Sequence, residues 1–444
     1  MSANAYEWGP TVWLAGTTTL GLGLLICVLV ARRESCVPQT VTALALQTVL
    51  AVFIFVNFGL VADDATYHAS ALAQARVWEF GSQTSSVFVG FGKESITVVV
   101  GALYYLFGVN PLLGLMLIAV LMATIPTMMA VSSRNFAFRA SAPTAAWLGA
   151  VAPPFLMWAP WLRREGFALF LLSGVVVGLS LVYRGRMRSG LLLLFGLTLA
   201  LAVTRAQLVL LVGAGLVVAY LLADSSRRRL SRARTRSRLL ILSGVGALLG
   251  AVTFSRIPME YWGNFLNGGL ATGIASNSAE SQTLRVSGVS WEFNSSPIGL
   301  LRNVARELWG PFLWEWQSPA WVVAGMDGLF YLILTFCLIQ AWRWGHRHRR
   351  PIVILLAALL PLVVGTALTM ANYGIVMRVR AHFLPFVIPI VAFYLQDAWR
   401  RWRQLVEPVM PWTEPPFQLP SATTVSCRVV EDGQYNYAGG TRSE

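Results

Sequence analysis

The sequence predicts an all-α fold, a polytopic transmembrane helical bundle of about eleven spans with interfacial helices and an extracytoplasmic loop cap. Two observations lead to this prediction. Hydrophobic residues make up 56% of the 444 residues and charged residues only 12%, far from the composition of soluble domains. The apolar residues also fall in separate runs of about twenty, enough at 1.5 Å per residue to cross a hydrocarbon core of roughly 30 Å.

The apolar runs follow one another along most of the chain. The first run, from Thr11 to Ala31, is preceded by Glu7 and by no basic residue, so we interpret it as a retained span rather than a signal peptide. The runs cover residues 11 to 31, 41 to 62, 111 to 132, 142 to 160, 167 to 183, 189 to 204, 206 to 223, 239 to 255, 320 to 342, 352 to 371 and 383 to 397.

The net charge of +14 indicates membrane orientation rather than a nucleic-acid partner, because the basic residues form short tracts between apolar runs. With the N-terminus outside, 21 of the 34 basic residues fall in cytoplasmic segments and eleven in outer ones. Seven arginines from Arg227 to Arg238 form the largest inner tract, typical of a loop on anionic lipid. All basic residues except Lys93 are arginine, a bias that favours a bacterial gene. We therefore expect a multi-pass protein of a bacterial plasma membrane.

Two long outer regions and a tail complete the predicted organisation. Residues 63–110 contain an apolar stretch, 96–108, that is too short to span and is expected to lie in the interface. Residues 256–319, rich in Trp, Asn, Ser and Gly, are expected to form a small cap. The transmembrane domain then covers residues 1–404. Residues 405–444, rich in proline, are predicted to form a disordered cytoplasmic tail.

An acidic pair, Asp63 and Asp64, stands at the outer end of the second apolar run. Adjacent carboxylates at a membrane surface repel each other and usually have a cation, a basic partner or a shared proton. One can be a general base or a metal ligand while the other orients it. The plain alternative is a solvated pair at a helix end. A divalent cation at Asp63 and Asp64 stays open, because the sequence shows no complete ligand set.

The residues after the acidic pair carry a family resemblance. An apolar stretch ends in Tyr104-Tyr105-Leu106-Phe107-Gly108, and Asn110-Pro111-Leu112-Leu113 opens the next span. Here the chain resembles the GT-C superfamily of polyprenyl-phosphate-sugar-dependent glycosyltransferases, the protein mannosyltransferase and aminoarabinose transferase-like group. The resemblance implies that Asp63 is the catalytic base and Asp64 its acidic neighbour. The substrate-binding candidates around the pair are Tyr67, His68, Lys93, Glu94, Tyr104 and His382.

The resemblance covers roughly residues 41 to 220. A span precedes the motif, and the soluble C-terminal domain that some members of the group carry is not expected here. The acceptor class is therefore open, and its recognition falls to residues 256–319. From Trp309 to Trp321 that region resembles an interfacial aromatic belt more than a carbohydrate-stacking surface.

Arginines on the predicted outer side are candidates for binding a lipid phosphate. Three cations within five residues before the last run go against the positive-inside bias, and an anionic donor supplies a reason for them. Guanidinium groups suit bidentate phosphate binding, although anchoring at lipid headgroups is a close alternative. The candidates are Arg378, Arg380, Arg163, Arg164 and Arg205.

The sequence thus favours an integral membrane glycosyltransferase that moves a sugar from a polyprenyl-phosphate donor to an extracytoplasmic glycan, lipid or protein acceptor, with no nucleic-acid partner. Two other functions remain open. A surface-polysaccharide polymerase or ligase would use lipid-diphosphate substrates and depend on the arginines more than on Asp63. A lipid-linked glycan transporter or flippase would show broken helices at the midplane and internal repeats.

Overall fold

The computed structural model describes residues 10–60, 62–80, 95–158, 161–224, 296–316, 319–369 and 373–406, and these residues form helices and turns without a strand. The predicted all-α fold is confirmed for these ranges. The helices are α1 (Pro10–Arg33), α2 (Val37–Phe58), α3 (Ala62–Phe80), α4 (Ser95–Phe107), α5 (Pro111–Ala123), α6 (Ile125–Asn135), η3 (Arg139–Ser141), α7 (Ala142–Val151), α8 (Pro153–Trp158), α9 (Arg164–Tyr183), α10 (Met187–Thr204), α11 (Ala206–Asp224), α14 (Pro297–Trp309), η5 (Leu313–Glu315), α15 (Pro319–Trp344), η6 (His346–His348), α16 (Arg349–Thr369), α17 (Tyr373–Arg380), η7 (Ala381–Phe383) and α18 (Leu384–Val406).

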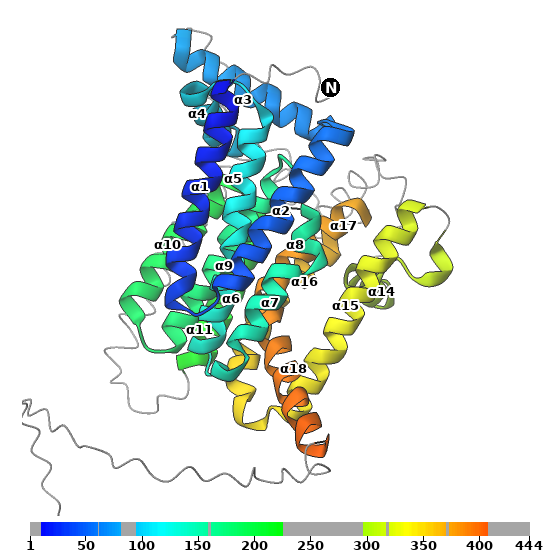
Figure 1. Cartoon of the computed structure of the whole chain (residues 1–444). Helices are drawn as coiled ribbons and strands as arrows, with labels where there is room; N and C mark the ends of the chain where they lie inside the picture. Colours follow the sequence, from blue (N-terminus) through cyan, green and yellow to red (C-terminus); the bar gives the residue numbers. More distant parts are fainter. Residues whose placement is uncertain are drawn as a thin grey trace, which may run out of the picture. The chain divides into compact units, whose positions relative to one another are not determined.

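The first two helices form a hairpin that packs on α5 (Figure 1). The turn between them contains Ser35 in the left-handed region, with φ 54°. Beside it, Glu34 accepts a hydrogen bond of 2.6 Å from Arg134 of α6, and the Glu34 carbonyl accepts another from the same guanidinium. This ion pair therefore ties the turn to the end of α6. The 22 residues of α2, about 33 Å long at 1.5 Å per residue, separate this turn from the start of α3.

Helix α3 lies across the ends of α1 and α2 instead of continuing either of them (Figure 1). It packs against α4, the apolar helix that the sequence predicted over residues 96–108. Asn110 ends the connection, because its side-chain oxygen accepts a hydrogen bond of 2.8 Å from the Leu112 amide. Pro111 takes the first helical position. The Asn-Pro-Leu-Leu sequence is therefore a helix-starting cap for α5.

Prolines divide two of the predicted runs. Helices α5 and α6 meet at Thr124, just before Pro126, yet together they make one continuous candidate span. Helices α7 and α8 are separated at Ala152, which is extended with ψ 124° as expected for a residue before a proline. Neither α7 nor α8 alone is long enough to cross a bilayer.

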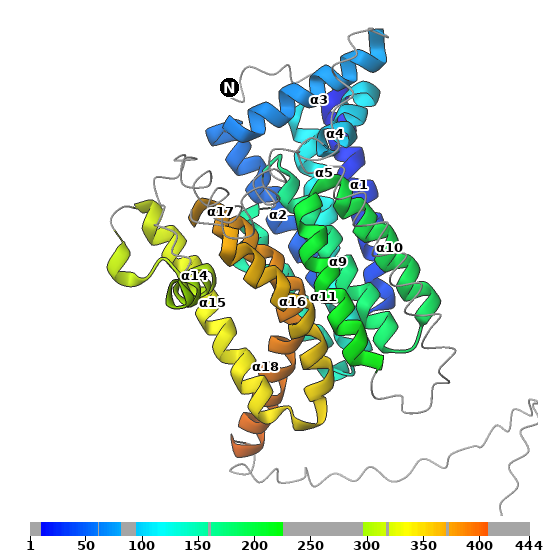
Figure 2. The ribbon, with the colours of Figure 1, turned by 180° about the vertical axis from the view of Figure 1, so that it is seen from behind.

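The second half of the described chain adds a hairpin of α9 and α10 and a close pair of α11 and α16 (Figure 2). Gly185 closes the hairpin with φ 94°. Gly215 of α11 faces the Ala358 backbone, which a β-carbon at that position would overlap. Helix α14 packs against α15, α16 and α17.

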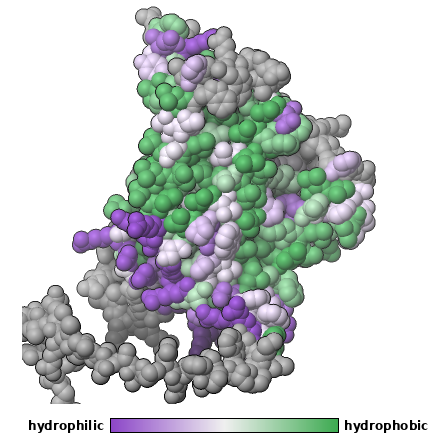
Figure 3. All heavy atoms as spheres, in the orientation of Figure 1, coloured by the Kyte–Doolittle hydropathy of each residue, from purple (hydrophilic) through white to green (hydrophobic). Residues whose placement is uncertain are grey.

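Eight helices among the described residues are long and apolar enough to cross a membrane, where the sequence predicted about eleven spans. The difference has three sources. The run 142–160 is broken, the apolar part of α11 covers only Gln207–Ala219, and the run 239–255 lies outside the described residues. In Figure 3 hydrophobic side chains cover the middle of the visible face, and hydrophilic ones gather toward two opposite ends. A multi-pass membrane protein fits these observations.

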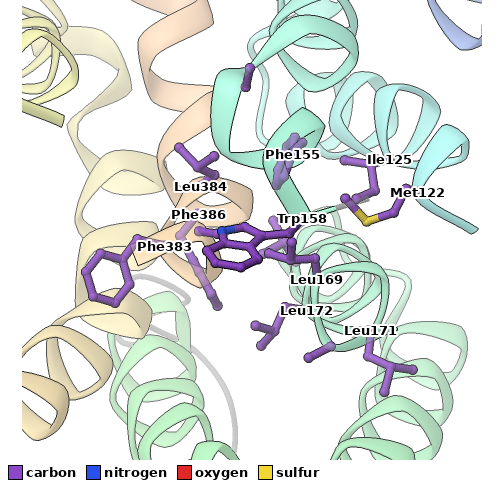
Figure 4. Packing of buried hydrophobic residues seen from close by; sticks show 14 of the residues in the cluster. Met122, Ile125, Phe155, Trp158, Leu169, Leu171, Leu172, Phe383, Leu384 and Phe386 are labelled. Carbon is purple, nitrogen blue, oxygen red and sulfur yellow. The ribbon is translucent and has the colours of Figure 1, made fainter. Parts of the chain in front are cut away.

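The most buried candidate spans are Pro111–Asn135, Arg164–Tyr183 and Tyr373–Val406, whereas α1, α2 and α10 keep many apolar side chains exposed. Figure 4 shows how the buried helices meet: the Trp158 ring of α8 lies among side chains of η7, α18 and α9. The buried helices form the centre, and the others present apolar faces outward. The chain divides into two units between Arg400 and Arg401, and the predicted tail from residue 407 onward lies outside the described residues.

Candidate functional site

The acidic pair occupies the first turn of α3, where the helix dipole favours negative charge. Consecutive helical residues point about 100° apart, and the two carboxylates differ accordingly. The side chain of Asp64 is 2% exposed and that of Asp63 is 47% exposed. The sequence had placed the pair at the end of the second span, and the structure places it at the start of the next helix. Asp63 is the more accessible carboxylate of the pair.

Arg163 contacts both carboxylates from the α8–α9 junction. Its Nε donates a hydrogen bond of 2.9 Å to Asp64 Oδ1, and its Nη1 lies 3.7 Å from Asp63 Oδ2. The guanidinium also lies over the Trp161 ring, 5.0 Å from the ring centre. Arg163 has an extended backbone just before α9 begins. One arginine therefore links the acidic pair to the start of α9.

Arg378 reaches Asp63 from the opposite end of the sequence. Its Nη2 donates a hydrogen bond of 3.1 Å to Asp63 Oδ2, across 315 residues of chain. The Arg378 guanidinium stands over Trp158, 5.8 Å from the ring centre. Helix α17 thus brings a cation to the accessible carboxylate.

A second ion pair lies beside the first. Glu165, buried in the first turn of α9, accepts a hydrogen bond from Arg205 at the α10–α11 junction. Arg164 and Arg378 also act electrostatically on Glu165. Tyr67, one turn after Asp63, has Arg164, Glu165, Arg205 and Asp63 as its charged neighbours. These contacts join both ion pairs into one group of charges.

We call this group the charge cluster. It has an excess of one positive charge, because four guanidinium groups face three carboxylates. Several donors in it are buried and have no hydrogen-bond acceptor among the described residues, namely the Nε atoms of Arg164, Arg205 and Arg378. A positive cluster with spare N–H donors can bind an anionic group such as a phosphate. The members are Asp63, Asp64, Arg163, Arg164, Glu165, Arg205 and Arg378.

His382 lies behind the charge cluster. It is fully buried in η7, its charged neighbours are Arg205, Glu165 and Arg164, and neither ring nitrogen has a hydrogen-bond partner among the described residues. It is therefore close to the cations that were predicted to bind phosphate.

Burial sets the protonation of two groups in α3. Burial raises the pKa of Asp64, and the Arg163 guanidinium opposes this shift. Burial lowers the pKa of His68, so this imidazole is neutral at neutral pH. His68 Nδ1 lies 2.9 Å from the Tyr104 hydroxyl. His68 and Tyr104 thus join α3 to α4.

Arg380 has a different setting from the one predicted. Its side chain is 0% exposed, and its donors go to protein oxygens: Nε to the Glu307 carbonyl at 2.5 Å, Nη1 to Asp327 at 3.0 Å, and Nη2 to the Arg306 and Gly310 carbonyls. The guanidinium caps the last turn of α14. We therefore leave Arg380 out of the candidate phosphate-binding residues.

The predicted Lys93 and Glu94 lie outside the described residues. Within the described ranges no group of three or more His, Cys, Asp and Glu side chains could hold a metal ion. Asp63 and Asp64 both face Arg163, and a divalent cation at this pair stays a prediction.

Glu165 and Trp158 were not among the site residues predicted from the sequence. A buried glutamate next to two arginines was a usable signal for Glu165, since charges near a membrane interior need partners. Trp158 had no such signal, because it belongs to an ordinary apolar run.

A comparison of the chain with protein-family models, with curated proteins and with solved structures finds no match.

Proposed function

We propose that this protein is an integral membrane glycosyltransferase that moves a sugar from a polyprenyl-phosphate donor to an extracytoplasmic glycan, lipid or protein acceptor. Asp63 is the general base, and Arg378, Arg163, Arg164 and Arg205 hold the lipid phosphate. The observation that carries the proposal is the pairing of the exposed carboxylate of Asp63 with Arg378, inside a cluster that has spare positive charge.

The two carboxylates take different roles. Asp63 is half exposed and can meet an acceptor hydroxyl, whereas Asp64 is buried and holds Arg163 in place. Before the donor binds, the Asp63 carboxylate is held in ion pairs with Arg163 and Arg378. When the donor phosphate binds Arg378, it competes with Asp63 for the guanidinium. Donor binding therefore frees the base at the moment when the donor is in place.

The proposed sugar transfer uses the residues of the charge cluster as follows. Asp63 takes the proton of the acceptor hydroxyl as its oxygen forms a bond to the anomeric carbon. The bond from that carbon to the phosphate oxygen breaks, and its electron pair leaves with the polyprenyl phosphate. Arg378 and Arg163 stabilise the charge that grows on this leaving group. Attack opposite to the phosphate inverts the anomeric configuration.

Complementation of a deletion strain tests the proposal. Asp63→Asn should fail to restore the surface glycan at normal protein abundance, because amide nitrogen cannot accept the proton. Glu34→Gln is the matched control, since it removes a carboxylate from an arginine pair at the α1–α2 turn, and it should restore the glycan fully. Wild-type glycan in the Asp63→Asn strain would contradict the proposal.

A polysaccharide polymerase or ligase gives a different pattern in the same strains. It should lose its product in Arg378→Ala and retain it in Asp63→Asn. The glycosyltransferase should lose product in both variants, since one removes the phosphate ligand and the other removes the base.

A further inference from the structure

A second group of buried ionisable residues lies apart from the charge cluster. Glu307 stands in the last turn of α14 with 0% of its surface exposed. Helices α15, α16 and α17 pack against α14. A carboxyl group in such a place is costly to ionise unless a cation compensates it.

The cation nearest to Glu307 is Arg380, and its guanidinium already binds other acceptors. Arg380 of α17 donates to three backbone carbonyls at the end of α14 and to the carboxylate of Asp327 in α15. Its guanidinium also lies over the Tyr331 ring at 5.8 Å. Four of the five N–H donors of Arg380 are thus engaged by acceptors other than the Glu307 carboxyl group, and its carboxylate partner is Asp327.

Among the residues that the structure describes, the other groups facing Glu307 do not supply a second cation. From α15 come Asp327 and Tyr331, from α17 comes Arg380, and from α16 comes Thr366. Arg306, on the same helix, is paired with Glu315 of η5. One guanidinium therefore faces two buried carboxyl groups, and only one of these can be ionised without leaving a net buried charge.

The hydrogen bonds indicate which of the two carboxyl groups holds the proton. Asp327 accepts a hydrogen bond of 3.0 Å from Arg380. Neither carboxyl oxygen of Glu307 has a hydrogen-bond partner among the described residues. An ionised carboxylate that lacks a hydrogen-bond donor and a cation of its own is costly to bury, so the proton belongs on Glu307.

We propose that Glu307 is a buried proton-binding site, neutral at physiological pH beside the Asp327–Arg380 ion pair, which releases its proton to solution at alkaline pH. Burial raises the pKa of Glu307 to about 8, against the attraction of Arg380. On release, a second carboxylate competes for Arg380, which anchors α17. This site does not depend on the role of Asp63.

Infrared difference spectroscopy of the full-length protein in nanodiscs tests the proposal. The pH is raised from about 6 to about 10, two units on either side of the pKa of about 8. The wild type should lose the carbonyl band of a protonated carboxylic acid, with a midpoint near pH 8. Glu307→Gln, which keeps the shape of the neutral form, should abolish the change. Glu79→Gln, an exposed carboxyl at the end of α3, should leave it intact.

A second variant tests whether competition between Asp327 and Glu307 for Arg380 contributes to the raised pKa of Glu307. Asp327→Asn frees Arg380 to pair with Glu307, so the midpoint should fall by about one to three pH units. Absence of the band in the wild type, or its persistence in Glu307→Gln, would overturn the proposal. An unchanged midpoint in folded Asp327→Asn would also overturn it, because competition for Arg380 would then play no part.

Discussion

Asp63 and Asp64 are neighbours in the chain, and substitution should separate a chemical role from a stabilising one. Removing Asp64 leaves the Arg163 guanidinium, only 10% exposed, without its hydrogen-bonded carboxylate. Breaking a buried pair in this way costs about 3–5 kcal/mol. Asp64→Ala should therefore lower the free energy of unfolding by about that amount, measured by thermal or denaturant unfolding in detergent.

Substitution of Asp63 should affect stability much less than substitution of Asp64. The Asp63 pair with Arg378 is partly exposed, with 31% of the Arg378 side chain and 47% of the Asp63 side chain accessible to solvent, and solvent-screened pairs contribute about 0–1 kcal/mol. Asp63→Ala should remain nearly as stable as the wild type. Equal destabilisation by both substitutions would show that the two carboxylates share one structural role.

Protonation of Glu307 should appear in the pH dependence of stability. Its pKa is about 8 in the folded protein and about 4.3 in an unfolded chain. Between these values the folded state holds a proton that the unfolded state has lost, so stability falls as pH rises, by about 1.4 kcal/mol per pH unit. Above about pH 8 this contribution stops changing.

The apparent melting temperature of the wild type should therefore drop between about pH 5 and pH 8 more than that of Glu307→Gln. Parallel curves for the two proteins would mean that Glu307 ionises alike in both states. Glu79→Gln serves as the control and should follow the wild type.

Two glycines of α11 test the close pairing of this helix with α16. A β-carbon at Gly215 would overlap the Ala358 backbone, which cannot move aside as a flexible side chain can. A β-carbon at Gly213 would meet nothing within 4 Å. Gly215→Ala should destabilise the protein by about 1–3 kcal/mol. Gly213→Ala should stabilise it by up to about 1 kcal/mol through helix propensity. Similar effects of the two substitutions on unfolding would contradict the close packing.

Helices with a strong local signal could be predicted from the sequence. The length of each apolar run identified α1, α2, α9 and α10, and the short stretch 96–108 gave α4. The run 142–160 was predicted as one span, and the structure divides its described part into α7 and α8; Pro153 and Pro154 carried the signal of this break. Counting apolar residues measures length, and it does not show where a proline divides that length.

The candidate site could be predicted only in part. Topology alone brought Asp63, Arg163 and Arg378 to one side, because each stands at an end of a predicted run. The sequence could not separate Arg378 from Arg380, two positions apart. Residues two apart on a helix point about 200° apart, so one faces Asp63 and the other faces α14. That division depends on what packs on each side of α17.

The orientation of the chain can be tested by labelling single cysteines. With the native cysteines replaced, Glu79→Cys in α3 should react with a membrane-impermeant maleimide in intact spheroplasts, because the N-out topology places α3 outside. Arg186→Cys, exposed between α9 and α10, should react only after permeabilisation. The reverse pattern would place the charge cluster on the cytoplasmic side and exclude an extracytoplasmic acceptor.

Mass spectrometry of the lipid-linked sugars in cells carrying Asp63→Asn or wild-type protein decides whether the charge cluster uses a polyprenyl-phosphate sugar. A block in transfer leaves the donor unused, so the Asp63→Asn cells should accumulate a polyprenyl-phosphate sugar and lack the glycan made from it, while Glu34→Gln cells match the wild type. Wild-type amounts of every lipid-linked sugar and of the surface glycan in Asp63→Asn cells, with the protein present at normal abundance, would contradict the proposed transfer reaction.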